Sequence, residues 1–260
     1  MSELPLERAL VLGLLHGPAE ALPVSSSAHI TLVPFLRGWD WQEIDPAARK
    51  RFEVALHAGA LVGLAFAARG ELTGAYTARR LARVIVPAVL PAALAGVLGQ
   101  EAIERRLGKP GQVAAGLLGG GVAMALADRL GGRERTLADA GVIDGLALGL
   151  AQAVALVPGV SRSGAARTVA RARGFHPQAA DQLATAVGLP VTLGAVAWKA
   201  RELRLADRRE LRTLAVGAAA SGVATAASGA LKARSLLPYS AYRAAVAGLV
   251  LRRLRENERQ

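Results

Sequence analysis

Long stretches without charge constrain the fold of this chain more than any other feature. Residues 112–127 carry no charged side chain, and 81–100 and 211–231 carry one each. Residues 54–68 are apolar on every helical face except at His57. A helix needs about 20 mostly apolar residues to cross a bilayer, and several of these stretches reach that length only with their flanks. The sequence therefore predicts an all-α, polytopic membrane protein with short or tilted helices.

Composition supports the membrane assignment and indicates what the basic residues bind. Hydrophobic residues make up 52% of the chain, more than is usual in a soluble domain with amphipathic helices. The net charge is +12, but the basic residues fall between the apolar stretches rather than along one face. This distribution favours lipid headgroups over nucleic acid as their partner. The chain has no cysteine, which excludes disulfides and thiol catalysis.

The coarse pattern is helical throughout. No hydrophilic stretch is long enough for a soluble domain, so residues 1–260 are expected to form a single transmembrane domain. The expected helices cover 6–18, 28–37, 52–68, 80–100, 111–130, 138–157, 163–173, 177–200, 210–232 and 239–254.

Two segments interrupt this helical pattern. Residues 17–29 and 157–164 each place proline, glycine and several serines inside an apolar neighbourhood. Irregular backbone at membrane depth persists only where protein or a water-filled cavity covers it. Both segments are therefore predicted to be the tips of re-entrant helix-loop-helix elements.

The interrupted segments occupy corresponding places in the two halves of the chain. A shift of 136 residues aligns 24–27 (VSSS) with 160–163 (VSRS). Paired broken segments of this kind point to a binding site between two repeats. We expect one repeat over about 1–130 and another over about 138–254, inverted if an odd number of spans separates them.

The first segment contains residues suited to phosphoryl chemistry. Glu20 is a carboxylate in an apolar stretch, and such residues are usually functional; a Glu that reaches the interface is the alternative. Ser25, Ser26 and Ser27 offer hydroxyls and backbone N–H groups at a helix start, which suits an anion but also ordinary capping. His29 is either a proton carrier for a hydroxyl or leaving oxygen, or a structural residue.

The second segment contains a positively charged side chain. Arg162 lies between Ser161 and Ser163, and its planar fork fits phosphate oxygens. A buried arginine needs an anion, which is either Glu20 in a plain ion pair or a bound diphosphate; the flanking glycines favour the diphosphate. A carboxylate beside a diphosphate is tolerated when a divalent cation lies between them, so Glu20 is also a candidate Mg²⁺ ligand.

These motifs resemble those of the undecaprenyl-diphosphatase family, also called bacitracin-resistance proteins. Residues 20–29 (EALPVSSSAH) fit its Glu-x-x-Pro-x-Ser-Ser-x-x-His segment, and 158–165 (PGVSRSGA) fit its second signature. Residues 52–59 (FEVALHAG) and 237–243 (LPYSAYR) are weaker matches. The resemblance covers nearly the whole chain.

The resemblance implies hydrolysis of undecaprenyl diphosphate to undecaprenyl phosphate in the bacterial plasma membrane, which recycles the carrier lipid of peptidoglycan. It implies Ser26 as nucleophile, Glu20 in metal or acid–base chemistry, and His29 in proton transfer. Arg162 is the implied phosphate clamp. Mg²⁺ or Ca²⁺ is the implied cofactor. The further candidates for phosphate binding are Ser25, Ser27, Ser161 and Ser163.

Three positions depart from the family pattern, of which Ala28 in place of a common Gly is a mild change. Four residues before Glu20 the family often has Glu or Gln, whereas this chain has His16. Residues four apart share a helical face, so His16 is expected to point into the site despite Pro18, and it is a further catalytic candidate. A neutral His is a poor ligand for a hard cation but a reasonable proton carrier. Gln182 stands where some members have Glu, which removes another charge.

Two other functions stay open at this stage. Inverted repeats and broken helices also suit a carrier that moves polyprenyl phosphate without hydrolysing it, which needs Arg162 but no nucleophile. The other is a phosphatase for a different lipid diphosphate, because a fold does not select a substrate. The expected partners are a polyprenyl lipid and the bilayer, and a homodimer is also open.

Overall fold

The chain is an all-helical bundle, as predicted. The computed structural model describes residues 4–74, 78–229, 231 and 234–259, and within these the only bridge of β type joins Arg135 to Phe175. The first half contains α1 (Leu6–Ala21), α2 (Ser26–Arg37), η1 (Trp41–Glu43), α3 (Pro46–Gly74), α4 (Ala78–Leu107) and α5 (Pro110–Leu130). The second half contains η2 (Leu137–Asp139), α6 (Val142–Val154), α7 (Arg162–Ala172), α8 (Pro177–Leu203), α9 (Arg208–Ser228) and α10 (Leu237–Asn257).

Every predicted helix occurs, but several boundaries differ. The helices α3 and α4 extend beyond the predicted 52–68 and 80–100 because their charged ends continue the helix past the apolar stretch. The helix α6 is shorter than the predicted 138–157, since a 3₁₀ turn precedes it and the second tip follows it. The predicted end of α9 at 232 lies outside the described residues. Hydropathy marks where a helix is apolar, not where its hydrogen bonding ends.

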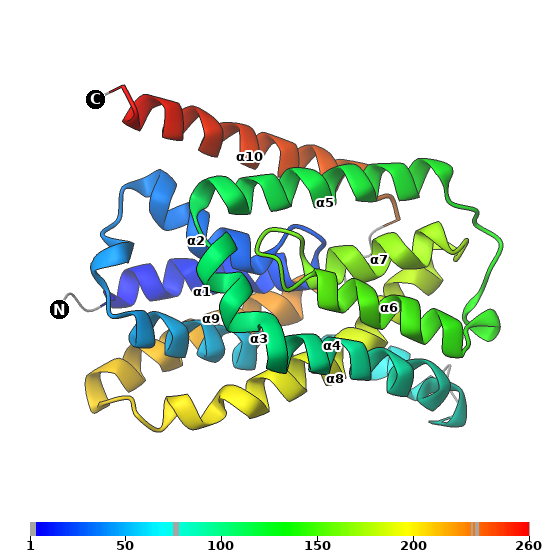
Figure 1. The fold of residues 1–260 in the computed structure, drawn as a ribbon. Coiled ribbons are helices and arrows are strands. Elements are labelled where there is room, and N and C mark those ends of the chain that lie inside the picture. Colours follow the sequence, from blue (N-terminus) through cyan, green and yellow to red (C-terminus); the bar gives the residue numbers. More distant parts are fainter. Residues whose placement is uncertain (1–3, 75–77, 230, 232–233, 260) are drawn as a thin grey trace.

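The two halves repeat the same order of elements. In each half a short helix turns back into a second short helix, and three longer helices follow. The first helix of each half packs on the fourth helix of the other, α1 on α9 and α6 on α4. Figure 1 shows α1 and α6 entering from opposite ends of the molecule and their following loops meeting near its middle. The order of elements and this packing are thus alike in the two halves, while the repeats over about 1–130 and 138–254 stay a prediction.

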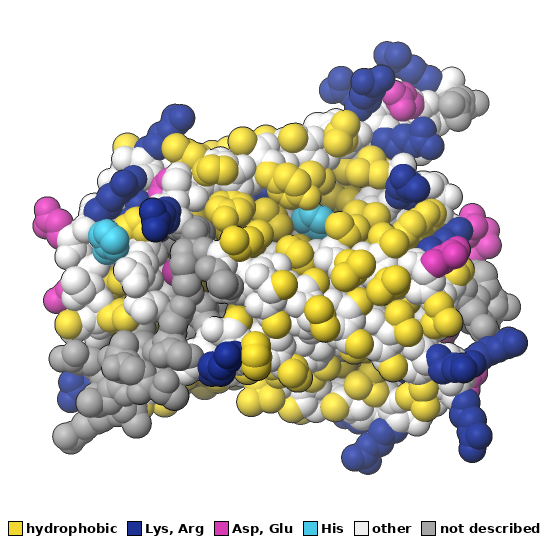
Figure 2. Space-filling model, turned by 180° about the vertical axis from the view of Figure 1, so that it is seen from behind, with side chains coloured by type: hydrophobic (Ala, Val, Ile, Leu, Met, Phe, Trp, Pro, Cys, Tyr) yellow, Lys and Arg dark blue, Asp and Glu magenta, His cyan; other side chains and the backbone are white. Residues whose placement is uncertain are grey.

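Long apolar helices make the chain a multi-pass membrane protein. Among the described residues four helices are long and apolar enough to cross a bilayer, within α3, α4, α5 and α8. Three of them lie between the two hairpins, the odd number that inverted repeats require. Hydrophobic side chains cover the middle of the surface in Figure 2, while Lys and Arg gather toward the helix ends. The depth of the hairpins in a bilayer, and hence their re-entrant character, stays a prediction.

Small residues allow α1, α3 and α9 to pack closely. A Cβ at Gly59 of α3 would lie 2.0 Å from the Ala218 carbonyl oxygen of α9, and one at Gly63 would lie 2.2 Å from that of Gly222. On α1, a Cβ at Gly13 would lie 2.5 Å from the carbonyl oxygen of Gly217. Small residues let helix backbones approach where lipid provides no hydrophobic drive. This packing fixes α1, and with it the first hairpin, against the core.

We predict that Gly59→Ala destabilises the bundle. The added methyl group collides with the α9 backbone, and such overpacking costs about 1–3 kcal/mol. The measurement is the midpoint of thermal unfolding in detergent. The matched control is Gly188→Ala on α8, where a Cβ meets nothing within 4 Å. Equal midpoints for the two variants would contradict the close approach of α3 and α9.

Candidate active site

The returning helix of each hairpin begins at a strained serine. Ser25 before α2 and Ser161 before α7 both have φ 74°. Residues other than glycine rarely adopt this conformation, and it costs on the order of 1–3 kcal/mol. Each serine Oγ accepts a hydrogen bond from the backbone N–H three residues on, that of Ala28 or Gly164. Two helix N-termini, which favour anions, therefore begin with the same cap.

The neighbouring serines line the two tips. The Oγ atoms of Ser25 and Ser27 lie 3.2 Å apart, and those of Ser161 and Ser163 lie 3.4 Å apart. Ser163 Oγ also donates to the Leu22 carbonyl of the opposite hairpin at 3.1 Å. The four hydroxyls thus gather where the hairpins meet. Their contact with phosphate stays a prediction.

A buried arginine of α10 joins both tips. Arg243 Nη1 donates to the Pro23 carbonyl at 3.3 Å, and Nη2 donates to those of Gly159 at 2.6 Å and Val160 at 2.9 Å. Its Nε donates to the Leu117 carbonyl of α5 at 3.1 Å. The side chain is 0% exposed. Arg243 therefore holds backbone from both halves in one arrangement.

A second buried arginine fastens the hairpins through α7. Arg167 pairs with Asp181 of α8 and donates to the Ala21 carbonyl at 3.1 Å and to the Ser163 carbonyl at 3.2 Å. Ala21 closes α1, one residue after Glu20, so Arg167 links the end of α1 to α7 and α8. The carboxylate of Glu20 is thereby held opposite the second tip.

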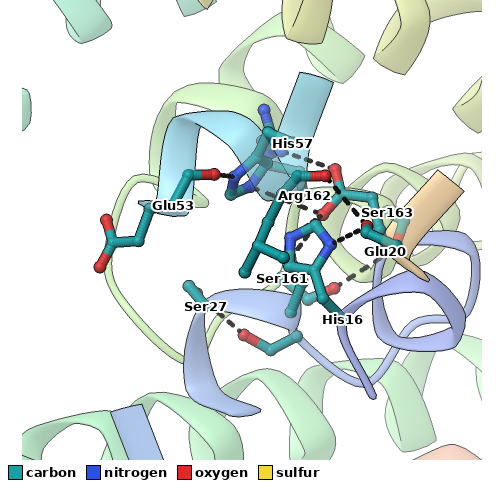
Figure 3. Close-up of polar contacts among 12 residues, drawn as sticks. His16, Glu20, Ser27, Glu53, His57, Ser161, Arg162 and Ser163 are labelled. Carbon is teal, nitrogen blue, oxygen red and sulfur yellow. Dashed lines mark hydrogen bonds and ion pairs between the residues drawn. The ribbon is translucent and has the colours of Figure 1, made fainter. Parts of the chain in front are cut away.

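Glu20 is the centre of the polar cluster. Its Oε1 accepts from Arg162 Nη2 at 2.6 Å, and its Oε2 accepts from Ser26 Oγ at 2.5 Å. The Nε2 atoms of His16 and His57 lie 4.0 Å and 3.7 Å from Oε2. Figure 3 shows both imidazoles and the guanidinium directed at this carboxylate. A hydroxyl, a carboxylate and a cation from three elements meet at one point.

His29 faces away from this centre. Its Nδ1 donates to the Ser25 carbonyl at 2.7 Å, and its Nε2 accepts from the Tyr242 hydroxyl of α10 at 2.7 Å. The two rings stack with an interplanar angle of 5°. Neither ring nitrogen of His29 bonds Glu20 or Ser26. The group in contact with Ser26 Oγ is the Glu20 carboxylate.

Residues 9–249 match the family described as "Bacitracin resistance protein BacA". The chain belongs to this family. An undecaprenyl-diphosphatase of Geobacter metallireducens is 36% identical over 90% of this chain and 91% of its own length. One of Pelobacter propionicus is 34% identical over 95% and 96%. One of Geobacter sulfurreducens is 36% identical over 94% and 96%. The predicted family is confirmed.

Several site residues of this BacA-family protein escaped the sequence analysis. His57 is the one strongly polar side chain in the apolar stretch 54–68, and that isolation was a usable signal. Arg167 follows Ser163 by four residues, on the same face of α7. Arg243 ends the weaker match at 237–243. Long-range partners such as Asp181 gave no sequence signal.

The donor set around Glu20 differs from the all-oxygen set that Mg²⁺ or Ca²⁺ prefers, and the predicted cofactor stays a prediction. In the described part of this BacA-family protein, the one group that could hold a metal ion is His16, Glu20 and His57, with ligand atoms within 4.8 Å of one another. Mg²⁺ and Ca²⁺ take oxygen ligands, whereas two of these three offer imidazole nitrogen. The replacement of the family's Glu or Gln by His16 therefore changes the ligand atoms that surround Glu20.

We predict that Arg243→Lys destabilises the protein. Lysine keeps the charge but cannot reach the carbonyls of both tips and α5 together, and each lost charged hydrogen bond costs about 1.5–3 kcal/mol. The measurement is thermal unfolding in detergent. Arg252→Lys on the same helix, where the side chain is 79% exposed, is the control and should unfold like the parent. An unchanged midpoint for Arg243→Lys would refute the role of the guanidinium in joining the hairpins.

Proposed function

We propose that this protein hydrolyses undecaprenyl diphosphate to undecaprenyl phosphate and inorganic phosphate. The observation that carries the proposal is the Ser26 hydroxyl, which donates to a buried carboxylate that also binds Arg162. A nucleophile, its base and a phosphate-binding cation are the parts that phosphoryl transfer needs. Relatives that cover at least 90% of this chain carry the name undecaprenyl-diphosphatase, which supports the same assignment.

In the proposed reaction Ser26 is the nucleophile and Glu20 is the base. The Ser26 hydroxyl attacks the terminal phosphorus and passes its proton to Glu20, while the phosphoanhydride bond breaks and its electrons leave with the lipid phosphate oxygen. Glu20 returns this proton to the departing lipid phosphate oxygen, and then acts as the base for the water that cleaves the phosphoserine ester and releases inorganic phosphate. The 2.5 Å contact between Ser26 Oγ and Glu20 Oε2 is already suitable for proton transfer.

Arg162 binds the developing charge. It lies at the first position of α7, so its side chain and the helix N-terminus act on the same anion. The guanidinium pairs with Glu20 at 2.6 Å. A bound diphosphate exchanges this partner for phosphate oxygens and frees one oxygen of Glu20 to act as base. The ion pair thus keeps the site organised between turnovers.

The apolar exterior favours a lipid substrate. Side chains near the middle of the long helices are exposed, including Val62 at 71% and Val223 at 69%, as expected for a surface in contact with acyl chains. A polyprenyl tail can remain in the bilayer while its diphosphate enters between the hairpins. The bacterial plasma membrane is the compartment that holds such carrier lipids. A homodimer remains a prediction.

We expect purified protein to release phosphate from undecaprenyl diphosphate, and Ser26→Ala to abolish the release. Arg162→Ala should lower it about 10²–10³-fold, because the transition-state charge loses its cation. Thr136→Ala is the control, since that exposed hydroxyl bonds the Asp139 carboxylate in the connection between α5 and α6. Lipid transport in vesicles without phosphate release would show that the protein is a carrier and not a phosphatase. Full activity in Ser26→Ala would reassign the nucleophile.

The base is tested by comparing Glu20→Gln with His29→Gln. Because Glu20 contacts Ser26 and His29 does not, Glu20→Gln should lower kcat about 10²–10⁴-fold. The loss in His29→Gln should be much smaller. The measurement is the steady-state rate of phosphate release, with circular dichroism confirming that each variant is folded. A larger loss in His29→Gln would make that histidine the base.

A further inference from the structure

The proton on His16 can be located from its partners. Ser221 Oγ donates to the Leu56 carbonyl at 3.0 Å, and a carbonyl only accepts, so the single hydroxyl proton of Ser221 is used there. Ser221 Oγ must therefore accept from His16 Nδ1, 2.8 Å away. The neutral ring then carries its proton on Nδ1 and a lone pair on Nε2. His16 is 0% exposed, and its buried Nε2 has no hydrogen-bond partner.

His57 has the same orientation. Its Nδ1 lies 2.8 Å from the Glu53 carbonyl, which can only accept, so Nδ1 carries the proton. The Nε2 lone pair of neutral His57 is directed at Glu20, with Nε2 3.7 Å from Oε2. The two imidazoles meet edge to face with ring centroids 4.7 Å apart. Two nitrogen lone pairs and a carboxylate oxygen therefore converge on one small volume.

A cation placed between these three electron-rich atoms would be attracted by all of them. The His16 and His57 nitrogens lie 4.0 Å and 3.7 Å from the Glu20 oxygen, beyond hydrogen-bond range. Tetrahedral ligands at about 2.1 Å from a metal ion stand about 3.4 Å apart. The two nitrogen–oxygen separations of 4.0 Å and 3.7 Å are near that spacing, and all three ligand atoms lie within 4.8 Å of one another. Arg162 does not fill the gap, because it binds the other oxygen, Oε1.

We propose that His16, Glu20 and His57 bind Zn²⁺ or a similar divalent transition metal ion, intermediate between hard and soft in its ligand preference. Two imidazoles and a carboxylate match the ligands such ions select, whereas Mg²⁺ and Ca²⁺ select oxygen. The hydrogen bonds on the two Nδ1 atoms are those that orient metal-bound histidines, here made to a hydroxyl and a backbone carbonyl.

The site needs only three protein ligands, so a fourth position stays open. Ser26 Oγ lies 2.5 Å from the same Glu20 oxygen, which places this hydroxyl beside the metal site. A divalent ion there adds charge next to Arg162, where an anionic headgroup would sit. The inference concerns metal binding by this chain and does not depend on the phosphatase activity.

The test is metal content. Tag-free protein is purified in detergent, stripped with a chelator, dialysed against Zn²⁺ in the presence of excess Mg²⁺, and analysed by mass spectrometry for bound metal. We expect one Zn²⁺ per chain, undiminished by Mg²⁺. His16→Gln and His57→Gln should each lose the bound ion. Replacement by Co²⁺ should give the visible absorption of a tetrahedral nitrogen–oxygen site in the parent protein only.

Two further variants separate ligation from folding. His176→Gln removes an exposed histidine before α8 and should keep the metal. Ser221→Ala keeps both imidazoles but removes the hydrogen bond that orients His16, and should weaken Zn²⁺ binding about 10- to 100-fold. The proposal is overturned if the parent binds no more Zn²⁺ than the His16→Gln/His57→Gln double variant, or if Mg²⁺ displaces the ion. Because phosphate release is not the readout, either result leaves the proposed function to its own test.

Discussion

The hydrogen bonds of Arg243 to both interrupted hairpins are the interaction on which the site depends. A guanidinium buried in a membrane protein is costly unless its donors are satisfied. Here they meet the carbonyls of Pro23, Gly159 and Val160, which the broken helices leave without helical partners. The guanidinium N–H groups and the loop carbonyls therefore satisfy each other's hydrogen-bonding capacity. Neither irregular tip would be stable in an apolar interior without such a donor.

This arrangement brings the reacting groups together from distant parts of the chain. Glu20 lies one residue before the end of α1, Ser26 begins α2, and Arg162 begins α7. The strained caps at Ser25 and Ser161 set where α2 and α7 begin. Strain at such positions persists only when the surrounding packing holds it, and it clusters at functional sites. The Ser26–Glu20–Arg162 contacts are thus a product of the two tips meeting.

The same centre explains how one carboxylate serves several partners. Arg162 uses one oxygen of Glu20, while Ser26 uses the other, toward which both imidazoles also point. A substrate phosphate competes for the guanidinium and leaves the serine contact intact. His16 replaces the Glu or Gln of the family resemblance, and imidazole nitrogen suits borderline cations better than hard ones.

The sequence by itself determined the helical class, the approximate helices, the two interrupted segments and most residues of the site. Long uncharged stretches are stable in a bilayer mainly as helices, and polar residues within them are usually functional. Only the tertiary structure decided that Glu20, rather than His29, contacts Ser26, because Glu20 ends up opposite Ser26 from another helix, while His29, one turn after Ser26 on α2, faces Tyr242. It also decided the roles of His57 and Arg243. Their partners lie in other elements, and hydrogen bonds across such distances depend on how the helices pack, which local periodicity does not encode.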